Sequence, residues 1–148
     1  MGIAALHESN AEEIAGYFGP QSMTWRIACE AVLMIGGGRA VLMQLAHPLV
    51  AAGVDAFSAY RSDPWRRFQE TLMMSEALTF GTRGEANAAA RTINRMHYHV
   101  RGQLSTSAGA FAAATPYHAH DPDLLFWVLA TLIDTALSLY PRLVGPLS

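Results

Sequence analysis

The sequence has little charge for its length. Of its 148 residues, 15% are charged and 51% are hydrophobic, whereas soluble domains usually carry about 25% charged residues. Disordered chains are poor in hydrophobic residues, so this composition excludes an unfolded chain. The length is sufficient for a real core. The shortage of charge therefore predicts a molecule that is mostly interior, or one whose apolar surface a partner covers.

Features that would mark several other protein classes are missing. Cys29 is the only cysteine, which excludes an internal disulfide, and its apolar neighbours indicate a buried, inert thiol. The formal net charge is −2, and no basic cluster exists beyond Arg66-Arg67, so nucleic acid is not predicted as a partner. The N-terminal residues are acidic, without a basic segment followed by an apolar run, so we expect no signal peptide.

The most apolar stretch, residues 27–54, is interrupted by charge and glycine. Glu30, the triplet Gly36-Gly37-Gly38, Arg39 and His47 leave no uncharged run of 18 residues in it, and a membrane-spanning helix needs about 20 apolar residues. We therefore expect no membrane-spanning segment and a cytoplasmic protein, with association to a membrane surface left open.

The remaining hydrophobic pattern is helical almost throughout, and strand-like alternation is absent. Asp63-Pro64 and Asp121-Pro122 are strong helix starts, because aspartate caps a helix and proline suits its first position. The pattern predicts an all-α fold, with a single helical domain over residues 1–148 and an N-terminal extension over residues 1–18. The predicted helices cover residues 10–18, 39–54, 64–80, 85–101 and 122–140. A further helix is predicted to start at Ser22 or Thr24 and to run to residue 35. The helix over residues 39–54 should be kinked at Pro48, and residues 103–120 are predicted to form a loop.

The glycine triplet does not predict a phosphate-binding loop. No strand precedes it, and the patterns GxGxxG and GxxxxGK[ST] are both absent. Close packing of helices or a sharp turn explains it better. On the last helix, Thr131, Asp134, Thr135 and Ser138 form a polar stripe, which we predict to be the solvent-exposed face.

His97 is the first candidate for chemistry. Alanine and larger apolar residues recur at helical spacing from Ala86 to Val100, and His97 falls on that stripe. Arg101 lies four residues further along the same face. A buried imidazole near an arginine is what a haem pocket needs, since the imidazole binds iron and the guanidinium pairs with a carboxylate of the cofactor. On spacing alone, a core histidine hydrogen-bonded to a carbonyl group is the simpler explanation.

Two other pairs of residues leave alternatives open. Arg67 and Thr71 project together from their helix, either toward a cofactor or oxygen, or into solvent with the threonine hydroxyl bonded back to the helix. His118 and His120 would share a side if extended and could bind a metal, but no cysteine or third histidine accompanies them in sequence.

Five stretches of the sequence, taken in order, resemble the catalytic domain of the MpaB/rubber-oxygenase family of the latex-clearing-protein type. They are PQSMTWRIACEAVLMIGGGRAVLMQLAHPLVAAGV, YRSDPWRRFQETL, FGTRGEANAAARTINRMHYHVRG, YHAHDPDLLFWVLATLIDTAL and YPRLVGPLS. The resemblance implies a helical, globin-like core that holds b-type haem. The family's HxxVR motif stands at His97 to Arg101, which makes His97 the iron ligand and Arg101 a cofactor-binding residue. The family's RxxxT motif stands at Arg67 and Thr71, beside the haem.

The resemblance implies a haem-dependent oxidoreductase that uses O₂ on a small apolar organic substrate. Members of the family continue past the PLS segment, so we expect a core that is incomplete at the C-terminus and is completed by a homo-oligomer or a complementary chain. Two other functions stay open at this point. The chain could bind haem or another apolar ligand without turnover, or it could be a structural half that needs a partner chain.

Overall fold

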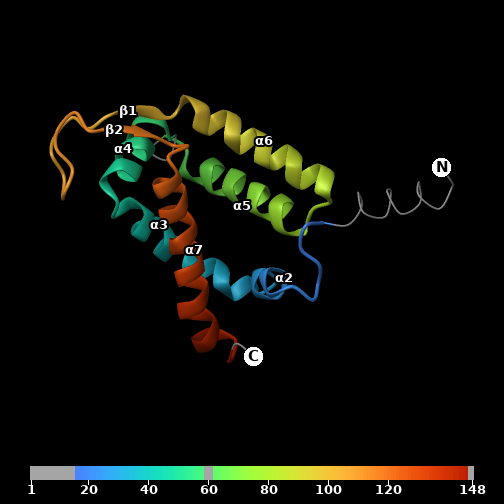
Figure 1. The fold of residues 1–148 in the computed structure, drawn as a ribbon. Helices are drawn as coiled ribbons and strands as arrows, with labels where there is room; N and C mark the ends of the chain where they lie inside the picture. Colours follow the sequence, from blue (N-terminus) through green and yellow to red (C-terminus); the bar gives the residue numbers. More distant parts are fainter. Residues whose placement is uncertain (1–15, 59–61, 147–148) are drawn as a thin grey trace, which may run out of the picture. The chain divides into compact units, whose positions relative to one another are not determined.

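The computed structural model describes residues 16–58 and 62–146, which fall into two compact units. The first unit is drawn from Met1–Cys29 and Tyr60–Asn94, and the second from Glu30–Ala59 and Arg95–Ser148. Both units are mostly helical (Figure 1), so the predicted helical class is confirmed, whereas the globin-like haem-binding core stays a prediction. Most of the acidic helix predicted over residues 10–18 lies outside the described residues, and residues 16–18 are not helical. The single-domain boundaries stay a prediction.

The first unit contains helices α2 (Met23–Ala28), α5 (Pro64–Phe80) and most of α6 (Arg83–His99). Ser22 caps α2, because its hydroxyl accepts the backbone N–H of Trp25 at 3.1 Å. Helices α2 and α5 pack together, and the rings of Trp25 and Phe80 meet edge-on with centroids 4.8 Å apart. The helix predicted to run on to residue 35 instead ends at Ala28. Cys29 follows at the helix end and is exposed, so its predicted burial is wrong.

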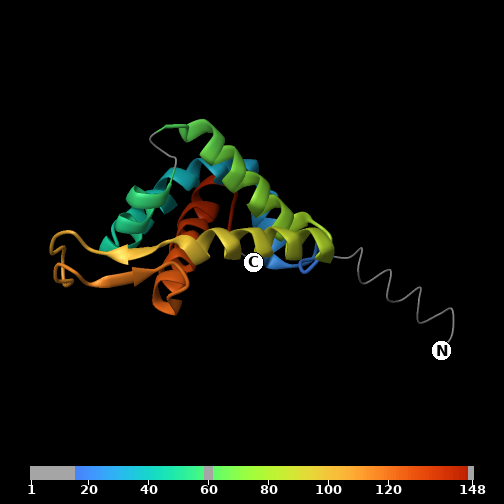
Figure 2. The ribbon, with the colours of Figure 1, turned by 90° about the horizontal axis from the view of Figure 1, so that it is seen from above.

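A tight turn joins α5 to α6 (Figure 2). Gly81 ends α5 as predicted, and a Cβ atom there would lie 2.5 Å from the carbonyl oxygen of Ala77. At the start of α6, the carboxylate of Glu85 accepts the backbone N–H of Thr82 at 2.8 Å and its hydroxyl at 2.9 Å, while Glu85 N–H donates to that hydroxyl. This is a reciprocal capping box. The hydrogen bonds from the Thr82 backbone and then its side chain hold the pKa of Glu85 below its ordinary value.

The second unit starts with a 3₁₀ helix, η1 (Ala31–Gly36), which leads directly into α3 (Gly37–Leu45). Both pack against α7 (Pro122–Leu143), which runs beside α3 in Figure 1. A Cβ atom at Gly36 would lie 2.6 Å from Leu139 Cδ1 and 2.8 Å from Thr135 Cγ2. The prediction that the glycine triplet permits close helix packing is therefore confirmed at Gly36.

The kink predicted at Pro48 is a complete break. Helix α3 ends at Leu45, α4 (Pro48–Phe57) begins at Pro48, and the helical stretches on either side are bent by 108°. His47 is extended, with φ −87° and ψ 118°. A residue before proline is pushed out of the helical region by the proline ring, and proline has no N–H to continue the previous helix. One predicted helix over residues 39–54 is therefore two.

The prediction that the chain has no strands is also wrong in one place. Strands β1 (Arg101–Gln103) and β2 (Pro116–His118) pair antiparallel, with Gly102 opposite Tyr117. They lie side by side in both views of the ribbon (Figures 1 and 2). A Cβ atom at Gly102 would lie 2.6 Å from Tyr117 Oη, so glycine lets this ring lie across β1. Tyr117 belongs to the core of the second unit with Leu49, Leu104 and Leu124.

The two threonines of the predicted polar stripe of α7 are buried, contrary to the prediction, whereas Asp134 is exposed as predicted. Thr131 is only 1% exposed and Thr135 only 6%. Thr135 Oγ1 accepts a hydrogen bond from Arg39 Nη1 at 2.8 Å, and Asp134, which is exposed, forms an ion pair with Arg39 Nη2 at 2.7 Å. Arg39 therefore ties α3 to the polar side of α7. The exposed large apolar residues of α7 include Leu125, Phe126, Leu129, Leu132, Ile133 and Leu137.

Helix α7 is also long and apolar enough to cross a membrane, with a mean hydropathy of 1.6 over its most apolar window. Length and composition alone are weak grounds for a span, because core helices of soluble proteins share them. The expectation of no membrane-spanning segment rests on residues 27–54, and α7 lies outside that stretch. Within that stretch, the segments Ala31–Leu45 and Pro48–Phe57 are apolar enough only as a pair, which is bent by 108°.

Candidate functional site

His97 lies in the last turn of α6, within the second unit, and is half-buried. Earlier on the predicted apolar stripe, Ala86 and Ala89 are buried, whereas Met96, beside His97, is 50% exposed. The neighbouring His99 is exposed. The helix thus places the His97 imidazole at the boundary between a packed and an open surface, where a ring nitrogen can meet a ligand.

The β hairpin brings a second histidine to His97. Strand β1 follows α6 directly, and its first residue, Arg101, pairs with His118 of β2. Two residues after His118, the ring of His120 packs edge-on against that of His97, with centroids 6.1 Å apart. His118 lies beside His120, with ring centroids 5.2 Å apart. The imidazole of His97 and those of the neighbouring pair His118 and His120 therefore gather at the end of α6.

This cluster does not form a multi-ligand metal site. Within residues 16–58 and 62–146, no group of three or more His, Cys, Asp or Glu side chains could hold a metal ion. His118 has another role, because its Nδ1 accepts the backbone N–H of His120 at 3.0 Å. One histidine ligand is enough for a metal that arrives inside a cofactor, where the macrocycle supplies most of the ligands.

Arg101 is exposed at the start of β1. Its guanidinium carbon lies 4.9 Å from the centre of the Tyr98 ring, a cation–π contact that fixes the side chain by its face. The N–H groups at the edge of a stacked guanidinium stay available for a carboxylate. Arg101 can therefore bind an anion close to the end of α6.

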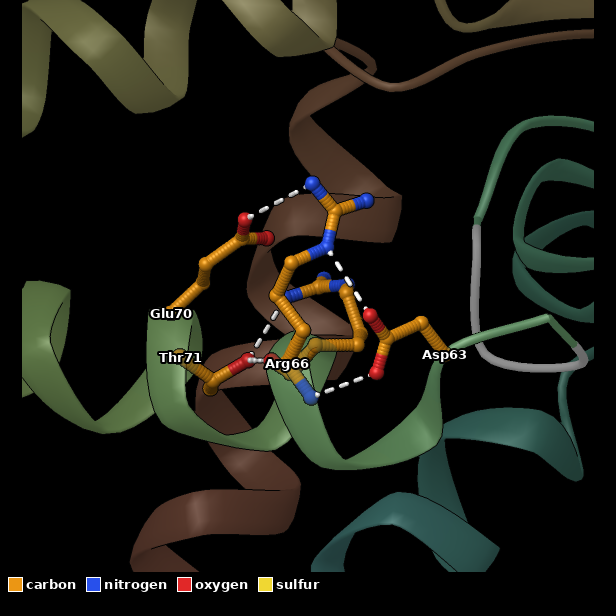
Figure 3. Close-up of polar contacts among 5 residues, drawn as sticks. Asp63, Arg66, Glu70 and Thr71 are labelled. Atoms are coloured by element: carbon orange, nitrogen blue, oxygen red, sulfur yellow. Dashed lines mark hydrogen bonds and ion pairs between the residues drawn. The ribbon is translucent and has the colours of Figure 1, made fainter.

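Arg67 and Thr71 lie on α5 and are both exposed. Arg67 Nη1 donates to Thr71 Oγ1 at 2.6 Å, and that hydroxyl donates to the carbonyl oxygen of Arg67 at 2.8 Å (Figure 3). A threonine hydroxyl has one proton, so Thr71 cannot donate to a ligand while it makes this bond. The back-bonded arrangement left open by the sequence is present, and the two side chains do project together.

The neighbouring Arg66 is held differently. Its Nε lies 3.4 Å from the carboxylate of Asp63 and its Nη1 lies 3.8 Å from that of Glu70 (Figure 3). Arg66 therefore pairs with two carboxylates in the first turns of α5, whereas Arg67 donates to the hydroxyl of Thr71. Arg67 and Thr71 belong to the first unit and His97 to the second, so the predicted proximity of these two groups stays a prediction.

Sequence reasoning missed two histidines whose ring nitrogens are buried. Nδ1 of His47 and Nε2 of His120 have no hydrogen-bond partner among the described residues. The His47 ring contacts the rings of Phe111 and Trp127, with centroids 5.3 and 5.7 Å away. In the sequence, the His47-Pro48 pair signals only a break in a helix, and His120 is only half of a possible metal-binding pair. No local pattern in the sequence marks either nitrogen as buried.

A comparison with known protein families shows which family the chain belongs to. The model of the ER-bound oxygenase mpaB/B′/rubber oxygenase catalytic domain matches residues 25–148. The chain belongs to this family. This match confirms the family predicted from the sequence. The members of the family are oxygenase catalytic domains. The matched range includes all four predicted site residues, Arg67, Thr71, His97 and Arg101. No curated protein and no solved structure matches the chain.

The resemblance implies a b-type haem, and the residues of the second unit fit that group in their chemistry. His97 offers a half-buried imidazole of the kind that binds haem iron. Arg101 offers a guanidinium for a carboxylate on the rim of the cofactor. His120 Nε2, next to His97, is a buried polar atom that still lacks a partner among the described residues. Each of these groups is of a type that a haem site uses.

Proposed function

We propose that the chain acts as a haem-dependent oxygenase that uses O₂ on an apolar organic substrate. The observation that carries the proposal is the family match over residues 25–148, which includes the motif His97-Tyr98-His99-Val100-Arg101. The half-buried position of His97 at the end of α6 supports it. A bound haem would supply the iron at which O₂ is activated.

The roles of the protein's own residues follow from their contacts. His97 would bind the iron through one ring nitrogen, and Arg101 would pair with a carboxylate of the cofactor. Arg67 uses Nη1 for Thr71 and keeps further N–H donors for a cofactor or a polar group of the substrate. The single proton of Thr71 is committed to the Arg67 carbonyl, so Thr71 would orient Arg67 rather than donate itself.

An absorption spectrum tests the proposal. The full chain, expressed with haem available and purified, is expected to show a Soret band. His97→Ala should abolish this band, because it removes the iron ligand. His99→Ala is the matched control, since it removes an exposed imidazole two residues away, and it should keep the band. A folded wild-type chain that takes up no haem would overturn the proposal.

We also propose that the apolar face of α7 associates with a membrane surface. That face is exposed while the threonines of the helix are buried, and the helix is apolar enough to enter a bilayer. The family description, an ER-bound oxygenase, fits this proposal.

Flotation with phosphatidylcholine vesicles tests membrane association. The wild-type chain should float with the vesicles, and Leu129→Glu should reduce the floating fraction because it places a charge on the apolar face. Gln103→Glu makes the same charge on an exposed strand and should float like the wild type. If the wild type stays with the soluble fraction and sediments as a homo-oligomer, a second copy covers the face instead, and the membrane proposal is wrong.

A further inference from the structure

His120 has a buried ring nitrogen with no partner among the described residues. That nitrogen is Nε2, and its ring lies edge-on to His97 with centroids 6.1 Å apart. Buried polar side-chain atoms in folded proteins nearly always have a hydrogen-bond partner. An exception carries a desolvation cost and needs a reason, such as a water or a ligand group that completes the bond. The position of His120 beside the proposed iron ligand suggests which group that is.

The backbone fixes His120 on both sides. Before it, the N–H of Ala119 donates to the carbonyl of Val100 at 2.9 Å, which extends the strand pairing. After it, Asp121 N–H donates to the carbonyl of His118 at 2.9 Å, and the Asp121 side chain caps α7. The segment between the hairpin and α7 therefore has little freedom. His120 lies in the turn that follows β2, and these flanking backbone bonds hold that turn in place.

His118 cannot play the same part in this arrangement. Its Nδ1 accepts the backbone N–H of His120 at 3.0 Å, so this atom carries no proton and is already bonded. His118 thus holds the turn, and His120 is the histidine of this pair whose ring contacts His97. The two histidines therefore differ in their contacts: His118 bonds to the backbone of the turn, and His120 contacts His97.

We infer that His120 is a positioning residue for the His97 imidazole. Its Nε2 accepts the hydrogen bond of the His97 ring nitrogen that faces away from a bound iron, directly or through one bridging water. Metal-ligating histidines almost always donate their second N–H to such a partner, which fixes the ring orientation and raises the basicity of the ligand. This inference rests on the proposed haem function.

Three variants of His120 separate a hydrogen-bonding role from a packing role. His120→Phe keeps an aromatic ring but removes both nitrogens. His120→Asn keeps a polar side chain that suits a turn, but its amide is too short to replace Nε2. His120→Gln places an amide oxygen near the position of Nε2 and is the conservative rescue. The matched control is His118→Asn, which removes the neighbouring imidazole while its side-chain oxygen can still accept the His120 N–H.

Haem titration and the iron reduction potential are the two measurements. His120→Phe and His120→Asn should bind haem roughly 10- to 100-fold more weakly than the wild type. They should also raise the reduction potential, because a less basic axial imidazole stabilises ferric iron less. His120→Gln should restore most of both values, and His118→Asn should match the wild type. A purely structural role for His120 would not give a potential that the glutamine variant restores.

The outcomes distinguish this inference from the proposed function. If the wild type takes up no haem, both fail. If His97→Ala loses haem while His120→Phe and His120→Asn keep the wild-type affinity and potential, the haem proposal stands and the inference about His120 is overturned. Should the phenylalanine variant lose its helical circular-dichroism signal, the asparagine and glutamine variants carry the comparison, and equal potentials in those two refute the inference.

Discussion

Replacing Gly36 by alanine tests the closest helix contact of the second unit. The backbone there has φ −67° and ψ −15°, a region that every residue adopts, so alanine introduces no backbone strain. The new Cβ atom, however, would lie 2.6 Å from Leu139 Cδ1 and 2.8 Å from Thr135 Cγ2. The end of Leu139 can rotate away. Thr135 is β-branched, 6% exposed and bonded to Arg39, so α7 itself has to shift.

The size of the effect follows from two opposing contributions. Inserting a carbon into a packed contact typically costs about 1–3 kcal/mol. Replacing a helical glycine by alanine contributes about 0.5–1 kcal/mol of stability. Gly37→Ala isolates the second contribution, because Gly37 is also helical, with φ −55° and ψ −41°, and a Cβ atom there meets nothing within 4 Å. The difference between the two variants is therefore the clash alone, about 1–3 kcal/mol.

Thermal unfolding followed by circular dichroism measures this difference. In a domain of this size, 1 kcal/mol shifts the Tm by about 2–4 °C. Gly36→Ala should therefore melt below Gly37→Ala by about 2–12 °C, while Gly37→Ala melts at or above the wild type. Equal melting temperatures for the two alanine variants would show that Gly36 of η1 does not lie in close contact with Leu139 and Thr135 of α7.

Three further predictions concern capping and polar contacts. Asp63→Ala removes the acceptor at the start of α5 and should lower the free energy of unfolding by about 1 kcal/mol in urea denaturation, whereas Asp63→Asn should recover most of the loss. Arg39→Ala leaves the buried hydroxyl of Thr135 without its donor and should cost about 1–3 kcal/mol; a variant as stable as the wild type would contradict this contact. The hydrogen bonds from Thr82 lower the pKa of Glu85 in the folded state, so its stabilising effect is present above the unfolded pKa and is lost as the pH falls through the folded one. Glu85→Gln should therefore flatten the acid side of the Tm–pH curve, and an unchanged curve would argue against the capping box.

The starts of the long helices could be predicted because they are decided locally. Asp63 and Asp121 accept backbone N–H groups two or three residues ahead, and each is followed by proline at the first helical position. Gly81 ends α5 for an equally local reason, its close approach to the Ala77 carbonyl. Such signals need no knowledge of the rest of the fold. The same is true of the hydrogen bonds between Arg67 and Thr71, which lie one helical turn apart.

The hairpin and the histidine cluster could not be predicted in this way. Strands β1 and β2 have three residues each, too few for an alternating pattern to appear. Their pairing depends on Tyr117 lying across Gly102 and joining the core of the second unit. The contact between His97 and His120 follows from that pairing. This contact is therefore a consequence of tertiary structure. A stretch of sequence that contains only one of the two residues cannot predict it.

Helix α7 shows why a periodic pattern alone does not tell inside from outside. The spacing of Thr131, Asp134 and Thr135 defines a stripe. Burying its hydroxyl groups costs little free energy if each forms a hydrogen bond. Thr131 donates to the Val128 carbonyl in its own helix, and Thr135 accepts from Arg39, which lies 96 residues earlier. Because both threonines find their partners inside the protein, the leucine-rich side of α7 is left exposed, together with Asp134. An apolar face of this kind is stabilised only by an apolar neighbour, and the paired flotation and sedimentation experiments decide whether that neighbour is lipid or a second copy of the chain.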